Sequence, residues 1–574
     1  MFKRLFSSKY LILFILLVAT FVRLYKINVV PPSLFGDELD LGYHAYSVLK
    51  TGKDYSGNFL PLHFHSLAEW RTPLYLYAAV PTVGVFGITP LGVRLPAVIF
   101  GILGIYGFYL LINLLTKNKS LALLSATLLT INPWDLQYSR AGFEVTMLLC
   151  FLLFGLYFFF LSFKKGGLLW LASTLLMLTP LIYSTAKMFT PFLMLLLFFV
   201  YRKEIFKIDK KNLIRAFVAS AIFGGITAYA VLFSGGSQRF NYISVFSDPT
   251  IETEVGVGRL TDARVRGLTG TGLTPSYVDR LFHNKFTFWV EKIINNYLTS
   301  FSSDFLFVSG DPNPRHMIDG MGMFYKIEAL ALIAGILFFV FSKDIDFRTK
   351  RVLTFWLIFG VLPSSITRDG GNHATRLIVI LPVLMFLISF GWYEMIKRIP
   401  KNLKLSSVSL MAGFYLLSFV FYLHSYYVHN PIQSERWWHA GWKEAITTIK
   451  EIDKNYDRVF ITMADEPAWI FFAAYYQYDP VKWHQGFPMK GTDVAGFGGV
   501  SYIDKYYFGA VNEDGASLYD LSKFITSKDL YLASAKEIPW NLAVDPGRIP
   551  QGLKLIKAIS YKSGDPAFYI FTKQ

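Results

Sequence analysis

The stretch Leu11-Ile-Leu-Phe-Ile-Leu-Leu-Val-Ala-Thr-Phe-Val22 is almost entirely apolar, and Pro31-Pro-Ser-Leu-Phe-Gly-Asp-Glu-Leu-Asp40 follows it closely. The first stretch has the composition of a membrane-spanning helix. Because no small-residue cleavage site follows it, we interpret it as a retained span and not as a signal peptide. The second stretch places two adjacent carboxylates at a membrane surface, where chemistry on a lipid-borne substrate would occur. Asp37 and Glu38 are therefore our candidates for the catalytic residues.

The composition of the chain is that of a membrane protein. Of 574 residues, 53% are hydrophobic and 17% are charged, whereas soluble globular chains carry roughly a quarter charged residues. The formal charge of +16 falls in short clusters between apolar segments, which indicates membrane topology and argues against a nucleic-acid partner. The single cysteine, Cys150, excludes an internal disulfide and a cysteine-based metal site.

About eleven segments are apolar enough to be membrane spans, to within about two because several are short. They are residues 10–27, 91–115, 121–131, 143–163, 168–183, 188–201, 213–233, 324–341, 352–366, 377–395 and 405–423. Residues 73–87 are also apolar, but a span there would invert the charge pattern of every later loop. We therefore expect residues 73–87 to form an interfacial helix.

Lys and Arg occupy every second connection between these segments, and the positive-inside rule makes those connections cytoplasmic. The N-terminus is then cytoplasmic, while the loops 28–90 and 234–323 face outward. After about residue 430 helical and strand-like patterns alternate. Residues 442–452, for example, predict a helix with Ile446, Ile449 and Ile452 on one face. We thus expect a multi-pass α-helical protein of the plasma membrane, with a membrane domain over residues 1–429 and an extracytoplasmic α/β domain over residues 430–574.

The loop 234–323 contains Gly256-Val-Gly258, several arginines and Gly267-Leu-Thr-Gly-Thr-Gly272. Glycine and arginine without apolar periodicity predict a mobile segment, which either folds over a bound phosphate or is merely disordered.

Six short motifs carry a family resemblance. They are Phe35-Gly-Asp-Glu38, Glu69-Trp-Arg-Thr-Pro73, Arg94-Leu-Pro96, Asn132-Pro-Trp134, Arg140-Ala-Gly-Phe-Glu144 and Asn372-His-Ala-Thr-Arg376. In their shared order the chain resembles the GT-C superfamily of membrane glycosyltransferases, in the branch of protein O-mannosyltransferases and lipid A aminoarabinose transferases. The resemblance implies a GT-C-like fold and inverting transfer of a sugar from a polyprenyl-phosphate donor, with Asp37 as the base.

The chemistry of such a transfer fits the outward loops. A phosphate-activated sugar leaves without a general acid, so one carboxylate base and cations for the departing phosphate suffice. Arg71, Arg315 and Arg376 face outward and suit the phosphate. Because no nucleotide-sugar pool exists outside the cytoplasm, the donor should be lipid-linked, and the acceptor is a lipid, a glycan or a protein.

The resemblance also concerns a possible metal. Glu69 lies at the family's second acidic position, where some members hold a divalent metal or contact the lipid phosphate, and His316 matches a histidine of some members. We expect either no cofactor or a divalent metal with Glu69 and His316 as ligands, to which His63, His65 and His373 could add. The chain departs from the family at Trp70, where a basic residue often follows the glutamate, and at Asp40, where some relatives have an arginine.

Simpler interpretations compete with these assignments. Asp37 could be the N-cap of a helix that starts near Glu38, and Glu144 could pair with Arg140. The aromatic residues of the C-terminal domain could bind a sugar or lie at the membrane interface; they are Trp437, Trp438, Trp442, Trp469, Tyr475, Tyr476 and Trp483.

Other functional classes also remain. A polyprenyl-lipid transporter would need ionisable groups near the membrane midplane and paired broken helices, whereas the spans are nearly free of charge. A sugar-binding sensor would have no need of Asp37. A ligase or polymerase of lipid-linked oligosaccharides would use the same donor chemistry, so it stays open.

The predicted topology can be tested by cysteine labelling. Cysteines introduced at Ser237 and Lys401 should react with a membrane-impermeant reagent from opposite sides of the membrane, because the charge pattern places them on opposite sides. Labelling of both from one side would overturn the outward placement of Asp37.

Overall fold

The computed structural model describes residues 8–66, 70–233, 238–268, 274–464, 467–486, 489–492, 498–509, 511 and 517–574. The chain divides into two compact units. The first, here called the helical unit, comprises Met1–Ile15, Gly104–Trp134 and Leu148–Tyr415. The second, here called the mixed unit, comprises Leu16–Leu103, Asp135–Met147 and Leu416–Gln574.

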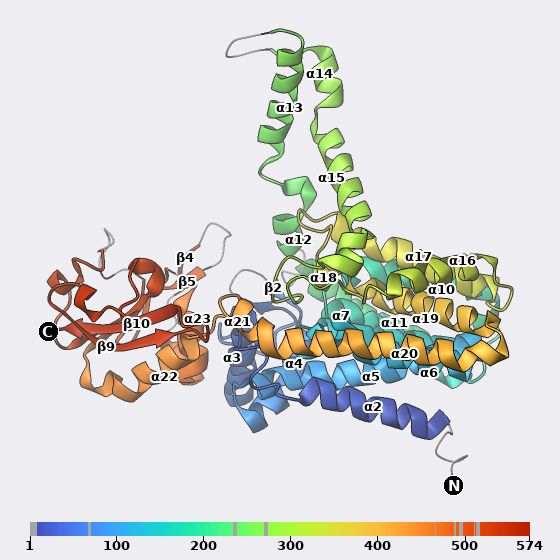
Figure 1. Ribbon diagram of the computed structural model, residues 1–574, viewed down its shortest axis with the longest axis horizontal. Coiled ribbons are helices and arrows are strands. Elements are labelled where there is room, and N and C mark those ends of the chain that lie inside the picture. Colours follow the sequence, from blue (N-terminus) through green and yellow to red (C-terminus); the bar gives the residue numbers. More distant parts are fainter. Residues whose placement is uncertain are drawn as a thin grey trace. The chain divides into compact units, whose positions relative to one another are not determined.

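A helix lies at each segment that was predicted to span the membrane (Figure 1). These helices are α2 Ser8–Leu24, α5 Pro90–Thr116, α6 Lys119–Ile131, α8 Val145–Ser162, α9 Leu169–Leu178, α10 Ala186–Ile205, α11 Lys210–Phe233, α16 Glu328–Phe341, α17 Phe347–Ser365, α19 Leu381–Arg398 and α20 Lys401–His424. Within the described ranges, five helical segments are long and apolar enough to cross a membrane, namely Pro90–Thr116, Val145–Ser162, Lys210–Phe233, Ala374–Arg398 and Lys401–Gln433. The chain is a multi-pass membrane protein, and the number of its spans stays a prediction.

The closest helix crossing in the helical unit joins α16 and α19 through two glycines. A Cβ atom on Gly335 would lie 1.9 Å from the carbonyl oxygen of Leu387, and one on Gly391 would lie 2.0 Å from that of Ala331. Helices in a membrane gain no hydrophobic driving force from each other and associate through such close backbone contact. The two glycines therefore fix how α16 and α19 pack.

Between residues 238 and 299 the described part of the loop 234–323 is mostly helical, although the sequence had indicated no regular structure there; its mobility stays a prediction. It contains α12 Gln238–Ile243, α13 Ile251–Val265, α14 Tyr277–Phe282 and α15 Lys285–Thr299, and the motif residues 269–272 lie outside the described residues. Capping boxes start α14 at Ser276 and α15 at Asn284. These two signals, S-x-x-D and N-x-x-T, were present in the sequence.

In the mixed unit the C-terminal domain is built on a six-stranded sheet of order β6-β7-β3-β8-β10-β9. Its strands are β3 Arg458–Ile461, β6 Tyr502–Ile503, β7 Tyr506–Phe508, β8 Asp529–Ser534, β9 Leu553–Ser560 and β10 Pro566–Lys573; the pair β4 Met489–Thr492 and β5 Gly498–Val500 lies apart. β3 runs parallel to β7 and β8, while β10 is antiparallel to β8 and β9. The helices are α22 Trp442–Ile452, α23 Ala468–Tyr476 and α24 Pro480–Gly486.

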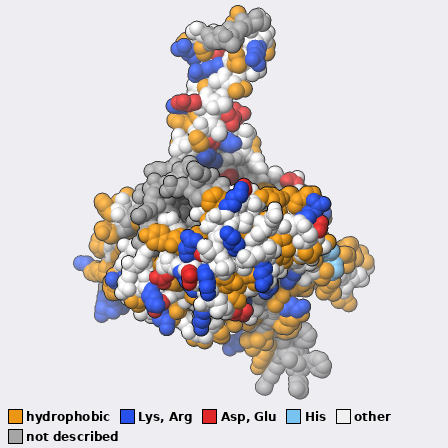
Figure 2. Space-filling view, turned by 90° about the vertical axis from the view of Figure 1, so that its left-hand side faces the viewer, with side chains coloured by type: hydrophobic (Ala, Val, Ile, Leu, Met, Phe, Trp, Pro, Cys, Tyr) orange, Lys and Arg blue, Asp and Glu red, His pale blue; other side chains and the backbone are white. Residues whose placement is uncertain are grey.

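The helices and strands after residue 440 agree with the predicted alternation of helical and strand-like segments, while the domain bounds and the side of the membrane stay predictions. α22 buries Ile446 and Ile449 on one face, as the helical spacing predicted. On β3, Phe460 packs in an apolar cluster with Tyr531 and Phe571. The residues before and after Phe460 on the strand point to the opposite face of the sheet, because successive side chains of a strand alternate. Basic and acidic side chains are scattered over the face that Figure 2 shows, with no single patch of one sign.

The mixed unit also contains the loop between α2 and α5, whose elements are α3 Gly36–Thr51, β1 Phe64–His65, β2 Trp70–Arg71 and α4 Pro73–Phe86. The short helix α7 Pro133–Ser139 lies between α6 and α8 in the chain. β1 and β2 pair antiparallel, with Phe64 opposite Arg71. A helix was expected at residues 73–87 and α4 supplies it; its place at the membrane interface stays a prediction.

The glycine crossing gives a stability prediction. Gly391→Ala should destabilise the protein by about 1 to 3 kcal/mol, because the new methyl group overlaps a backbone oxygen that cannot swing away. The matched control is Gly413→Ala in α20, whose Cβ would meet no atom within 4 Å among the residues described. Thermal unfolding in detergent should show a lower Tm for the first variant and an unchanged or higher Tm for the control. Equal Tm values would contradict the proposed packing.

Candidate active site

The acidic segment of the first loop forms the N-terminal turn of α3. The N-cap position is Phe35, whose side chain has no group that could cap a helix. Asp37 and Glu38 lie inside the first turn, where the helix dipole stabilises negative charge. Asp37 is therefore not the N-cap residue, and that alternative is excluded.

Burial separates the three carboxylates of this turn. The side chain of Asp37 is 48% exposed, and its Oδ1 lies 2.7 Å from Nη2 of Arg71. Glu38 and Asp40 are completely buried. Of the three, Asp37 is the carboxylate that a substrate can reach.

Both oxygens of Glu38 are already bound inside the protein. Arg94 donates from Nε at 2.7 Å and from Nη2 at 2.8 Å, and the backbone N–H of Gly142 donates to Oε1 at 2.7 Å. Such a bidentate, buried pair holds its partners in one geometry. This geometry does not support the catalytic role predicted for Glu38. It suits a residue that fixes the position of the first turn of α3.

Asp40 belongs to a buried polar network behind Asp37. It accepts hydrogen bonds from the Tyr55 hydroxyl at 2.6 Å and from Ser66 Oγ at 2.7 Å, and Arg71 Nε lies 3.4 Å away. Burial raises the pKa of Asp40, although Arg71 and the two hydrogen bonds act in the opposite direction. Burial also lowers the pKa of His44, which stacks on Tyr55, to about 3, so His44 is neutral at physiological pH.

Arg71 lies among the carboxylates of this network. It forms an ion pair with Asp37, donates from Nε to Ser66 Oγ at 3.0 Å, and its Nη1 lies 3.9 Å from Oε1 of Glu144. Glu144 thus faces Arg71, and the expected Glu144–Arg140 pair is wrong. Because the Arg71 guanidinium is buried beside these acids, it is placed to orient Asp37; its predicted contact with the donor phosphate stays a prediction.

Two further buried arginines hold the chain that leads into α3. Arg94 donates to the carbonyl oxygens of residues 27, 31 and 33 in addition to Glu38. Arg140 donates to the carbonyl oxygens of residues 22, 23, 25 and 30 and to the Tyr426 hydroxyl. Both arginines belong to motifs noted in the sequence, but this structural role was not predicted. Their acceptors are backbone carbonyl oxygens, which every residue has, so no residue type in the sequence marks them.

The C-terminal domain packs directly on the start of α3. The N–H of Gly36 donates to Nδ1 of His439 at 3.2 Å, and the Tyr475 hydroxyl donates to the carbonyl oxygen of Leu34 at 3.2 Å. Trp438 contacts Phe35 edge to face. Most aromatic residues considered as sugar platforms are core residues here: Trp438, Trp442, Trp469 and Trp483 are buried. They stabilise the domain and its contact with α3.

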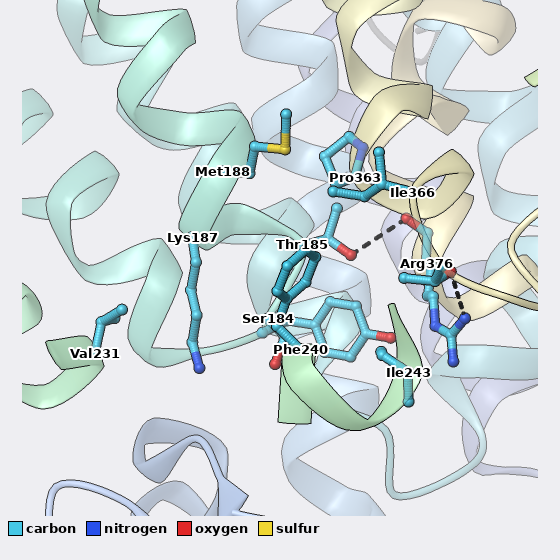
Figure 3. A pocket seen from close by; sticks show the side chains of 12 residues that line it. Ser184, Thr185, Lys187, Met188, Val231, Phe240, Ile243, Pro363, Ile366 and Arg376 are labelled. Atoms are coloured by element: carbon cyan, nitrogen blue, oxygen red, sulfur yellow. Dashed lines mark hydrogen bonds between the residues drawn. The ribbon is translucent and has the colours of Figure 1, made fainter. Parts of the chain in front are cut away.

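The helical unit contains an apolar groove with two cationic side chains. One cavity of about 340 Å³ is lined by Lys187, Val231 and Arg376, and a second of about 590 Å³ also includes Lys187 and Val231, so the two adjoin. Figure 3 shows Lys187 and Arg376 on either side of Thr185 in the first cavity. Arg376 is held by Thr367 Oγ1 at 2.7 Å and by Asp369. Lys187 was not singled out by the sequence.

The remaining predicted phosphate ligands are placed as follows. Arg315 is half-buried, and its Nε donates to Asn313 Oδ1 at 3.4 Å. Glu69 lies outside the described residues. The structure therefore leaves the predicted roles of Arg315 and Glu69 untested.

His316 lies in a cluster that could hold a metal ion, together with Asp311 and His373. One ligand atom of each residue lies within 4.8 Å of the others. Asp311 Oδ2 lies 2.9 Å from His316 Nδ1 and also accepts the N–H of Ala374 at 2.8 Å. A carboxylate beside one ring nitrogen is the usual arrangement behind metal-binding histidines. Imidazole ligands favour zinc and other transition metals.

No protein-family model matches the chain. No curated protein matches it in sequence. Among solved structures, it is similar to ArnT from Cupriavidus metallidurans bound to undecaprenyl phosphate, with a TM-score of 0.51 and 12% identity over 98% of this chain and 97% of ArnT. It is also similar to the oligosaccharyltransferase AglB from Archaeoglobus fulgidus, with a TM-score of 0.45 and 14% identity over 83% of this chain. The chain spans 64% of the length of AglB.

The similarity to ArnT covers nearly the whole of both chains. The chain therefore shares its fold with ArnT, which agrees with the GT-C-like fold that the motif order predicted. At 12% identity this similarity establishes the fold, and the activity has to be argued from the site.

The histidine cluster gives a metal-binding prediction. The purified protein should bind Zn²⁺, and His316→Ala and His373→Ala should each weaken binding by about 10- to 100-fold or more, because each removes a ligand or its support. His424→Ala, which removes a histidine of α20, is the matched control. Isothermal titration after EDTA treatment measures the affinity. Binding that is unchanged in both cluster variants would show that the metal lies elsewhere.

Proposed function

We propose that the chain transfers a sugar from a polyprenyl-phosphate donor to an acceptor hydroxyl on the extracytoplasmic side of the membrane. The observation that carries the proposal is the first turn of α3. There Asp37 is half-exposed and oriented by Arg71, while Glu38 and Asp40 are buried and bound by other groups. One accessible carboxylate held in a fixed position is what a general base requires.

In this reaction Asp37 accepts the proton of the acceptor hydroxyl as its oxygen attacks C1 of the sugar. The bond between C1 and the phosphate oxygen breaks, and polyprenyl phosphate leaves with the bonding electrons. The attack and the departure occur on opposite faces of C1, so one displacement inverts the anomeric configuration. A retaining mechanism would need a second displacement by an enzyme nucleophile, and the buried, occupied Glu38 is poorly suited to that role.

The groove of the helical unit suits the donor. Its walls are apolar side chains, such as Val231, Pro363 and Ile366, which match a polyprenyl chain. Lys187 and Arg376 place positive charge beside this apolar surface, where it would neutralise the phosphate. A lipid phosphate therefore matches both the shape and the charge of the groove.

The C-terminal domain is proposed to meet the acceptor, which is a lipid, a glycan or a protein. We assign residues 430–574 to this domain. They also have a structural role that was not predicted from the sequence, which is to hold the start of α3. Because His439 and Tyr475 bond to the entry of α3, removing the domain would also disturb Asp37. Deletion of the domain is therefore a poor test of acceptor binding, and point variants are required.

Asp37→Asn should slow sugar transfer by at least about 100-fold, the usual effect of losing a positioned general base. Donor binding and Tm should stay near those of the unmodified protein, since the side chain is half-exposed. The assay measures release of labelled polyprenyl phosphate from a panel of polyprenyl-phosphate hexoses and pentoses in proteoliposomes.

The matched control for Asp37→Asn is Glu144→Gln. It removes another carboxylate next to Arg71 but not the proposed base, so it should change the rate by only a few-fold. Near-normal turnover in Asp37→Asn, or an equal loss in both variants, would contradict the role of Asp37.

A further inference from the structure

The helices α13, α14 and α15 form a long hairpin that projects from the helical unit (Figure 1). Polar contacts join its two sides: Arg266 binds Asp279 through two hydrogen bonds of 2.6 Å, and His283 Nε2 lies 2.9 Å from Asp262. Polar contacts thus contribute to holding the hairpin together. Many apolar side chains of its described residues are exposed.

These apolar side chains form a continuous stripe along α14 and α15. On α15, Phe286, Ile294 and Leu298 are 68%, 50% and 63% exposed, and Val290 lies between them at the same four-residue spacing. On α14, Leu281 and Phe282 continue the stripe. The fifteen residues of α15 span about 22 Å. This is a long exposed apolar surface for an outward loop, and surfaces of this size mark a binding partner.

The orientation of the hairpin identifies that partner. In Figure 1 the helices α10, α16, α17 and α19 run horizontally and the hairpin runs vertically. A helix perpendicular to membrane-spanning helices lies parallel to the bilayer plane. In Figure 1, α14 and α15 also lie on the side of the hairpin toward which the spanning helices extend, and α13 lies on the other side.

The root of the hairpin lies at the end of a spanning helix. Asn296 near the end of α15 donates to the carbonyl oxygens of Ser365 and Thr367 at 3.0 and 2.7 Å, just where α17 ends. Ser300 donates to the carbonyl oxygen of Gly371 at 2.9 Å. The hairpin therefore starts at the level where the spanning helices leave the apolar part of the bilayer.

The composition of α15 matches a membrane interface. Its sequence, Lys285-Phe-Thr-Phe-Trp-Val-Glu-Lys-Ile-Ile-Asn-Asn-Tyr-Leu-Thr299, combines Phe, Trp and Tyr with two lysines. Interfacial helices carry aromatic and aliphatic residues on one face and Lys or Arg beside it, where lipid phosphates lie. The opposite helix α13 exposes the charged Glu252, Glu254 and Arg264 together with Val257 and Val265, and it has no aromatic residue. Figure 2, which views the hairpin from that side, shows charged side chains along it.

We propose that α14 and α15 form an interfacial arm that lies on the outer leaflet of the membrane, with the stripe from Leu281 to Leu298 inserted among the lipid headgroups. The partner is the lipid surface itself. The inference stands on its own and does not require sugar transfer. It does affect the groove: Phe240 and Ile243 of α12, at the root of the hairpin, line the same cavity as Arg376. The arm therefore sets the level at which that cavity meets the headgroups.

The test uses single cysteines labelled with the environment-sensitive fluorophore NBD. Labels at Phe286→Cys and Ile294→Cys report the stripe, and labels at Thr253→Cys and Thr261→Cys on α13 are the matched controls. Cys150 is buried and stays in place. Each variant is reconstituted as one protein per nanodisc, in phosphatidylcholine with and without phosphatidylglycerol, so that a second copy cannot cover the stripe.

The expected result is a blue-shifted NBD emission at positions 286 and 294, quenched by lipids with brominated acyl chains, and water-like emission without quenching at positions 253 and 261. Two results would overturn the arm. One is water-like emission at all four positions. The other is protection of 286 and 294 that occurs only when two copies share a nanodisc, which would make the stripe a contact between copies of the chain.

Discussion

The position of the candidate base depends on two buried guanidinium groups. The chain between α2 and α3 has irregular backbone, and its carbonyl oxygens need hydrogen-bond donors that water cannot supply inside the fold. Arg94 and Arg140 supply those donors, and Arg94 also binds Glu38 with two hydrogen bonds. Removing one partner of such a buried pair costs about 3 to 5 kcal/mol. An exposed pair such as Arg436 with Asp565 contributes only about 0 to 1 kcal/mol.

The buried contacts around the first turn of α3 explain why only one of its three carboxylates is suited to act as a base. The other two hold the turn in place. Glu38 points inward, where Arg94 and the N–H of Gly142 saturate it, and Asp40 is satisfied by Tyr55 and Ser66. Successive side chains of a helical turn point about 100° apart, so Asp37 points elsewhere and reaches solvent beside Arg71. A rigid, buried surround and one accessible group together give a pre-organised site.

Much of the fold was predictable from the sequence because apolar length and periodicity report helices directly. α22 begins and ends at the predicted residues, and each predicted span contains a helix. The hairpin was missed because Gly256, Gly258 and the arginines outweighed the amphipathic pattern of α15. Gly258 is suited to its helix for a reason outside local sequence: a Cβ there would meet His283 Nδ1 at 2.6 Å.

The candidate site was only partly predictable. The sequence pointed to four residues of the candidate sites: Asp37, Arg71, Arg376 and His316. It did not reveal several of the contacts that position the candidate site, because the residues that make them lie far apart in the chain. Glu144 pairs with Arg71 and not with its neighbour Arg140, and His439 bonds to Gly36 across about 400 residues. Backbone acceptors and such long-range partners have no local signature.

The contact between His439 and Gly36 also changes the expected role of the C-terminal domain. In addition to the proposed contact with the acceptor, the domain binds the first N–H of α3, the helix that carries the candidate base. That N–H is one of the four that a helix leaves unsatisfied at its start, and Phe35 at the N-cap cannot satisfy it. Nδ1 of His439 supplies the missing acceptor from the C-terminal domain. The C-terminal domain thus completes the N-terminal turn of α3, which holds Asp37.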